Sequence, residues 1–214
     1  MPLLILTGYP CAGKTTRAHQ IATYLGERIA STSAKAALRT ARVHLINDEA
    51  LGVSREAYGA AKTEKDARAA FYSAVKRALG PTDFVIADGM NYIKGFRYQL
   101  YCEAKAVRST SCVIHVGAPI PTCRANNDAR LASMSPSPSS AEPPTTIPAD
   151  SPPSANASAP PPPPPYPPST LDNLIYRYEE PSSLARWDTP LFTVPASDAA
   201  PPLDAIWSAL VPAS

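Results

Sequence analysis

The sequence has few cysteines, and none of them has the spacing of a metal site. Its four cysteines include no Cys-x-x-Cys pair, which argues against a zinc module and against a small disulfide-stabilised scaffold. Reduced thiols in a cytosolic or nuclear protein are therefore the expected state. The four are Cys11, Cys102, Cys112 and Cys123.

Long apolar runs and a strong net charge are also missing. The run Leu3–Leu6 is too short for a signal peptide or a membrane span, and no longer run follows. A net charge of +2 over 214 residues is too small to argue by itself for a nucleic-acid partner. We expect a soluble protein without a membrane partner, cytoplasmic and nuclear, and long enough to bury a sizeable core.

Proline, in contrast, is abundant and unevenly distributed. Of 26 prolines, 15 lie between Ser135 and Pro168. Such a segment has too little apolar surface to offset the entropy of ordering, so we predict that it is disordered or adopts polyproline II. Docking of SH3 or WW domains is one role for it, and a tolerated surface insertion is the interpretation we favour. The sequence thus predicts one domain in two parts, residues 1–134 and 170–214, with an insertion at 135–169.

Outside that segment, short apolar runs alternate with stretches of helical periodicity. This alternation predicts a five-stranded parallel sheet with helices on both faces. One helix should begin with Thr63 as its N-cap and stop at Gly80–Pro81. The predicted strands are 3–7, 43–46, 84–88, 112–116 and 191–194, and the other predicted helices are 15–29, 94–107, 120–131 and 203–210.

The clearest motif is a Walker A sequence, Gly-Tyr-Pro-Cys-Ala-Gly-Lys-Thr, between the first predicted strand and helix. Its glycines let the backbone wrap phosphates, Lys14 should reach the β- and γ-phosphates, and the Thr15 hydroxyl should bind Mg²⁺. A chance glycine-rich turn is the alternative. The predicted nucleotide-binding residues are Gly8, Tyr9, Pro10, Cys11, Ala12, Gly13, Lys14, Thr15 and Thr16.

Two acids follow apolar strands, at the edge where parallel sheets bind ligands. Asp88 ends a strand as a Walker B aspartate does, so it should hold Mg²⁺, unless it caps the next segment instead. Asp48 is placed to activate an attacking hydroxyl or water, with a helix cap as the alternative.

Several basic residues are candidates for phosphate or partner contacts. Arg124 and Arg130 fall on the polar helix before the insertion, where they could stabilise the transferring phosphoryl group or simply face solvent. For Arg177, an ion pair with the nearby Glu179 or Glu180 competes with a phosphate role. A basic stretch that could meet a partner, or form a solvated face, comprises Lys94, Arg97, Lys105 and Arg108.

Three long stretches resemble one known family. They are the opening Leu6–Thr16, the block Asp88–Lys105 with its Asn-Tyr-Ile-Lys-Gly-Phe-Arg-Tyr string, and Leu171–Pro181. Together they resemble the Elongator-associated P-loop ATPases whose loss makes yeast resistant to killer toxin, a family related to the L-seryl-tRNA(Sec) kinases. The resemblance covers nearly all of the chain outside the Pro-rich segment.

This resemblance implies a kinase-like P-loop NTPase fold that binds ATP with Mg²⁺ and hydrolyses ATP when stimulated by tRNA. It also implies regulation of the Elongator complex in tRNA wobble-uridine modification. Lys14, Asp48, Asp88, Arg124 and Arg130 carry over as catalytic residues, with Thr15 and Asp88 on the metal. The arginine spacing is wider than in the kinases. Family members continue into a C-terminal domain that shares tRNA binding, so residues 1–214 should respond weakly to tRNA.

Two other functions remain open at this point. A kinase that phosphorylates a tRNA-linked or small hydroxyl substrate would use the same loop. A nucleotide-gated binding module with little turnover would keep ATP binding but need no activating carboxylate.

Overall fold

We describe a computed structural model of the chain, which covers residues 2–31, 40–80, 82–134 and 164–211. Five parallel strands form one sheet in the order β2-β3-β1-β4-β5. The predicted five-stranded α/β fold is confirmed. The strands are β1 (Leu3–Thr7), β2 (Val43–Asn47), β3 (Phe84–Asp88), β4 (Ser111–Gly117) and β5 (Leu191–Pro195).

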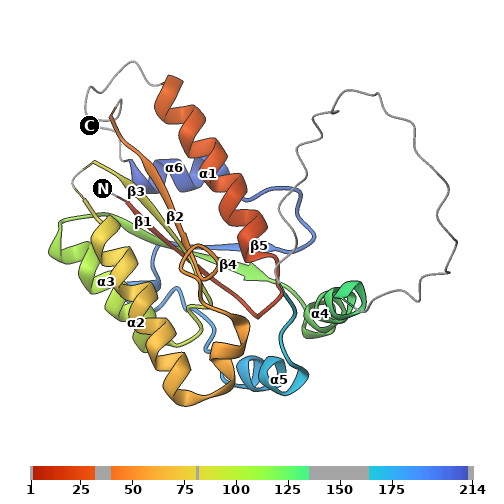
Figure 1. The fold of residues 1–214 in the computed structure, drawn as a ribbon. Helices are drawn as coiled ribbons and strands as arrows, with labels where there is room; N and C mark the ends of the chain where they lie inside the picture. The colour runs from red at the N-terminus through yellow and green to blue at the C-terminus, as the bar shows by residue number, and fades with distance from the viewer. Residues whose placement is uncertain (1, 32–39, 81, 135–163, 212–214) are drawn as a thin grey trace, which may run out of the picture.

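Helices cover both faces of this sheet (Figure 1). Because side chains alternate along a strand, Leu4 and Leu6 of β1 face α1 and α6, whereas Leu3 and Ile5 face α2 and α3. The α-helices are α1 (Lys14–Ser31), α2 (Ala61–Ala78), α3 (Lys94–Ala106), α4 (Ile120–Met134), α5 (Pro168–Tyr176) and α6 (Leu203–Leu210), and the short 3₁₀ helices are η1 (Arg55–Gly59) and η2 (Arg186–Asp188). Among the described residues, no helix is long and apolar enough to cross a membrane.

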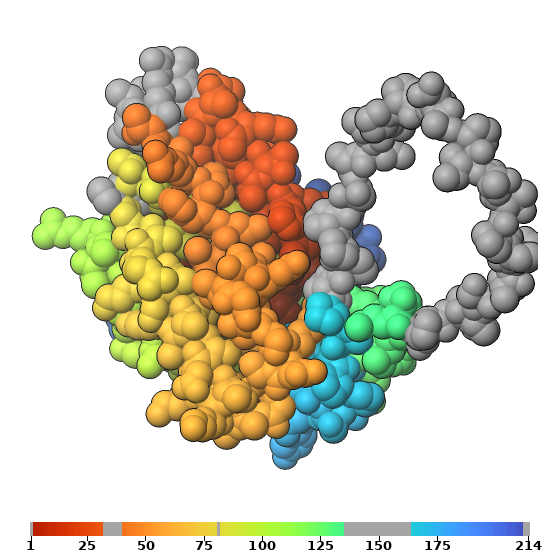
Figure 2. Space-filling model, in the orientation of Figure 1, coloured from red at the N-terminus to blue at the C-terminus, as the bar shows by residue number. Residues whose placement is uncertain are grey.

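The helices α4 and α5 lie beyond the carboxyl ends of the strands rather than on a face of the sheet (Figure 1). Figure 2 shows α5 packed between α4 and the segment that contains η1. α5 includes Pro168 and Ser169, the last two residues of the predicted insertion. Residues 135–163 of the predicted insertion lie outside the described residues.

Two sequence-based predictions about side chains are wrong. Thr63 does not cap α2, because η1 leads directly into a helix that begins at Ala61, and the Thr63 hydroxyl donates to the Ala57 and Ala60 carbonyls instead. Arg97 belongs to no basic surface, since it is fully buried against Asp188.

Candidate functional site

The phosphate loop joins β1 to α1 and has a backbone that only glycine can adopt at its first position. Gly8 has φ +148°, and a Cβ there would lie 2.6 Å from the Val116 carbonyl oxygen. Gly13 and Cys11 also have positive φ, at +93° and +61°. The loop therefore turns tightly enough to point backbone groups inward, as a phosphate cradle requires.

All nine predicted nucleotide-binding residues lie in this loop or in the first turn of α1. The Lys14 ammonium donates to the carbonyls of Gly8 and Tyr9, at 3.0 and 2.7 Å, so it lies over the loop. Thr15 and Thr16 stay exposed. A ligand at the N-terminus of α1 would thus meet one ammonium group and two exposed hydroxyl-bearing side chains.

Strand register brings Asp88 to the same edge. Asp88 pairs in register with Leu6, two residues before the loop, and its carboxylate accepts a hydrogen bond from the Thr15 side chain. Burial raises the pKa of Asp88 to about 6, although the Thr15 bond and the nearby Lys14 charge oppose that rise. Among the described residues, its Oδ2 atom has no hydrogen-bond partner.

These properties fit a magnesium site. Mg²⁺ is bound through one or two carboxylates and keeps most of its remaining oxygen ligands as waters or substrate phosphates. A buried carboxylate oxygen without a partner beside an exposed threonine hydroxyl offers that donor set. Thr15 and Asp88 are the residues that would hold the ion.

Asp48 comes directly after β2, and register places the end of that strand, Asn47, beside Asp88. The Asp48 Oδ2 atom accepts a 2.6 Å hydrogen bond from the Tyr58 hydroxyl, while Oδ1 has no partner among the described residues. Burial raises the pKa of Asp48, against the Tyr58 bond and the Lys14 charge. The side chain that caps the turn here is Asn47, which bonds the Ala50 amide at 2.8 Å.

A small cavity lies against Asp48. Its volume is about 10 Å³, close to the smallest that can hold a single water. Most of its large lining side chains are aromatic. The lining includes Tyr58, Phe71, Met90, Tyr92 and Phe96.

The two predicted arginines of α4 differ in position. Arg130 Nη1 lies 3.4 Å from the Cys11 sulfur of the phosphate loop, whereas Arg124 forms a 2.9 Å ion pair with Asp172 of α5. Asn126 adds a 3.0 Å bond to the Cys11 carbonyl. The structure thus brings Arg130 to the loop and directs Arg124 towards α5.

Three residues of the site region were missed from the sequence. Arg55 lies 3.9 Å from the Cys11 sulfur and stacks over the Tyr166 ring at 4.4 Å. Asn91, in a left-handed conformation, donates to the carbonyls of Leu6 and Ala87 and so ties β1 to β3. Asn127 exchanges two hydrogen bonds with the Tyr166 backbone. Apart from the Asn91–Ala87 bond, each contact joins segments that are distant in the sequence, and only the position of Arg55 soon after Asp48 could have served as a signal.

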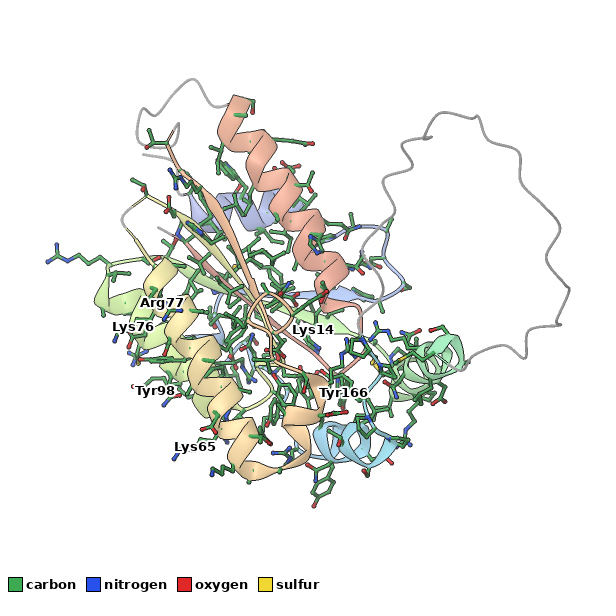
Figure 3. All side chains as sticks on the ribbon, in the orientation of Figure 1. Lys14, Lys65, Lys76, Arg77, Tyr98 and Tyr166 are labelled. Carbon is green, nitrogen blue, oxygen red and sulfur yellow. The ribbon has the colours of Figure 1, made fainter. Side chains whose placement is uncertain are left out.

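Arg177 makes an ion pair, but not with its sequence neighbours. Its Nη2 atom lies 2.9 Å from Glu64, a buried acid at the start of α2 that also binds Arg68 and the Tyr92 hydroxyl. This cluster fixes the end of α5 to α2. Figure 3 shows Lys14 at the start of α1 and Tyr166 near α5.

Solved structures of other proteins share this architecture. The crystal structure of Chaetomium thermophilum Kti12 in complex with ADP-AlF3 is 43% identical, with a TM-score of 0.77, and the match covers 98% of this chain and all of that one. A gluconokinase from Sinorhizobium meliloti 1021 has a TM-score of 0.55 at 13% identity over 98% of this chain and 89% of that one, which shows the kinase-like P-loop fold alone.

Sequence comparison gives the same relationship. Protein kti12 of Schizosaccharomyces pombe is 43% identical over 211 residues, which cover 99% of this chain and 63% of that protein. Protein KTI12 of Saccharomyces cerevisiae is 38% identical over 194 residues, covering 91% and 51%. This chain therefore spans about half to two thirds of the length of these relatives. The sequence profile described as "Chromatin associated protein KTI12" matches residues 1–214, and the chain belongs to the KTI12 family.

Proposed function

We propose that this chain binds ATP with Mg²⁺ and hydrolyses it, as a regulatory factor of the Elongator complex in tRNA wobble-uridine modification. The observation that carries the hydrolytic part is the pair of carboxylates, Asp48 and Asp88, that meet at the phosphate loop. Asp88 is buried and Asp48 is half-buried, and each has one buried oxygen without a partner among the described residues. Two such oxygens beside Lys14 suit a bound metal and an activated nucleophile.

The residues have separate roles in this proposal. Lys14 and the loop amides hold the phosphates, and Mg²⁺, when bound by Thr15 and Asp88, neutralises charge on the phosphate oxygens. Asp48 accepts a hydrogen bond from the attacking water through Oδ1, while the Tyr58 bond to Oδ2 holds the carboxylate in place. Arg130 stabilises the charge that develops on the transferring group.

The small cavity favours water over a larger acceptor. Small-molecule sites usually offer about 300–1,000 Å³, whereas the space against Asp48 is about 10 Å³. A kinase acceptor that entered this cavity would have to displace the aromatic side chains that line it. Hydrolysis needs room for one water only.

The proposed partners, the Elongator complex and tRNA, rest on the family resemblance of Asp88–Lys105 and Leu171–Pro181 rather than on the geometry of the site. The chromatin-associated family description supports a nuclear location. The family resemblance implies that a C-terminal domain shares tRNA binding, so tRNA stimulation should be weak in residues 1–214 alone.

The test follows the γ-phosphate. Residues 1–214 are incubated with γ-labelled ATP and Mg²⁺, with and without tRNA, and the label is separated into free phosphate, tRNA and unreacted ATP. We expect label in free phosphate. Label on tRNA would identify a kinase, and ATP binding without release of label would identify a nucleotide-gated module.

A further inference from the structure

A hollow on the described surface lies at the opposite end of the sheet from the phosphate loop. Its volume is about 490 Å³. Ser111, the first residue of β4, and Pro190, directly before β5, are among its lining residues, so it lies at the amino ends of these strands. We call it the α3 groove; its lining residues are Tyr101, Lys105, Thr110, Ser111, Ser183, Leu184, Arg186, Thr189, Pro190 and Ala209.

The charges of the α3 groove have one sign. Its lining holds two cations, Lys105 and Arg186, and no carboxylate. Among the described residues, neither cation takes part in an ion pair, although other nearby cations do, as in Arg97–Asp188 and Lys94–Glu179. Lys105 instead lies over the Tyr101 ring at 5.2 Å. The groove is thus complementary to a ligand with negative charge.

Apolar groups lie beside these cations. Leu184 on the groove rim is 96% exposed, more than any other large apolar side chain of the described residues. Tyr98, 46% exposed, packs edge-on against Trp187 at 5.4 Å and lies beside Tyr101. An exposed leucine next to tyrosines is typical of a surface that buries apolar side chains of a protein partner.

The loop that forms one wall is held firmly. The Asp188 carboxylate accepts hydrogen bonds from Arg97 and from the Ser182 amide, at 2.8 and 3.1 Å. The Thr189 hydroxyl bonds the carbonyls of Ser183 and Ala185, both at 3.1 Å. A preformed wall lowers the ordering cost of binding, which favours a docking role.

We propose that the α3 groove docks an extended acidic segment of another protein, with an apolar side chain of that segment against Leu184 and acidic ones at Lys105 and Arg186. Nucleic acid fits less well, because duplex-binding proteins commonly make about 6–10 phosphate contacts, whereas this groove offers two cations. The proposal does not depend on ATP hydrolysis, so the two can fail separately.

The test measures binding of a defined probe to the whole chain. The probe is a fluorescein-labelled peptide of alternating Asp and Leu, followed by fluorescence anisotropy at low and high salt. The double variant Lys105→Glu/Arg186→Glu should weaken binding by about tenfold or more, since attraction becomes repulsion, and Leu184→Ser should weaken it as well. Both variants should bind ATP as the wild type does.

The matched control reverses the same charges elsewhere. Lys65 and Arg77 of α2 are exposed and are labelled in Figure 3 with Tyr98, and Lys65→Glu/Arg77→Glu should leave peptide binding unchanged. An equal loss in both double variants would show non-specific attraction and overturn the proposal. So would no binding of the peptide, or tighter binding of a single-stranded RNA that the groove variant abolishes.

Discussion

Arg97 of α3 and Asp188 of η2 form a buried two-point ion pair, with distances of 2.8 Å from Nε to Oδ1 and 3.2 Å from Nη2 to Oδ2. The remaining nitrogen of Arg97, Nη1, donates to the carbonyls of Asn91 and Glu179, at 3.0 and 2.9 Å. One guanidinium therefore connects the segment after β3, near the phosphate loop, with the loop that walls the α3 groove.

Removing one partner of this pair should be costly. We expect Asp188→Ala to lower the free energy of unfolding by about 3–5 kcal/mol, because it leaves the Arg97 charge buried without a counter-charge. Urea denaturation measures this change. Asp172→Ala removes the half-exposed partner of Arg124 and should cost no more than about 1 kcal/mol; equal costs would contradict the role assigned to burial.

The phosphate loop should tolerate no side chain at Gly8. Gly8→Ala would place a Cβ 2.6 Å from the Val116 carbonyl oxygen at a φ of +148°, so we expect a loss of about 1–3 kcal/mol of stability together with loss of ATP binding. Gly26→Ala is the control, since nothing lies within 4 Å of its Cβ and alanine in a helix gains roughly 0.5–1 kcal/mol. Thermal unfolding and titration with ATP check both, and a Gly8→Ala protein that binds ATP normally would refute the close-packed loop.

Substitutions of Lys14 and Asp48 should affect different steps, ATP binding for Lys14 and turnover for Asp48. Lys14→Ala removes a charged donor to the phosphates and should weaken ATP binding by roughly 10- to 150-fold, which corresponds to about 1.5–3 kcal/mol. Asp48→Asn should leave binding within about twofold and lower the rate of phosphate release by about 10²–10⁴-fold, the range for loss of general-base catalysis. An Asp48→Asn protein with full turnover would exclude Asp48 as the base.

The two arginines of α4 should differ in their effect on the rate. Arg130 reaches the phosphate loop, so Arg130→Ala should lower the rate of phosphate release by about 10³-fold, in the range of other transition-state arginines. Arg124 faces Asp172, and Arg124→Ala should change the rate less than about threefold. Single-turnover kinetics at saturating ATP distinguishes the two, and a larger effect of Arg124 would reverse their assignment.

The raised pKa of Asp88 should make stability depend on pH. Burial raises it from the ordinary 3.8 to about 6, so the folded state holds the proton more tightly than the unfolded chain. The resulting stabilisation, about 2–3 kcal/mol, is fully present below pH 3.8 and is lost as pH rises through about 6. The free energies of unfolding of the wild type and of Asp88→Asn, measured with urea across this pH range, should diverge.

The pH dependence of Mg²⁺ binding is a second test of the raised pKa of Asp88. Binding of the ion needs ionised Asp88, so affinity for Mg²⁺ with ADP should rise with pH up to about 6. Parallel pH curves for the wild type and Asp88→Asn would show that another group is responsible.

Much of the fold could be predicted because its signals are local. The apolar run of β1 and the glycines of the loop mark the phosphate site within about a dozen neighbouring residues, and α6 was predicted with its observed bounds, Leu203–Leu210. The strand order could not be predicted in this way. A crossover places β3 between β2 and β1, and no local pattern encodes that choice.

The missed contacts are all long-range. Arg97 looked like part of a basic face because its partner Asp188 lies 91 residues further along the chain. Arg177 stands beside two glutamates in sequence, yet it pairs with Glu64, 113 residues away. Periodicity identifies which face of a helix is buried, but it does not show that a buried cation has a distant acid to neutralise it.

The exchange of hydrogen bonds between Asn127 and Tyr166 has an evolutionary consequence. Asn127 donates to the Tyr166 carbonyl at 2.9 Å and accepts from its amide at 2.8 Å, so the chain on either side of residues 135–163 is fastened together. Lengthening a connection between fixed ends costs only about 0.6 kcal/mol per doubling. Descendants of this sequence can therefore gain or lose residues in that segment while Arg130, and the Tyr166 ring that supports Arg55, stay at the phosphate loop.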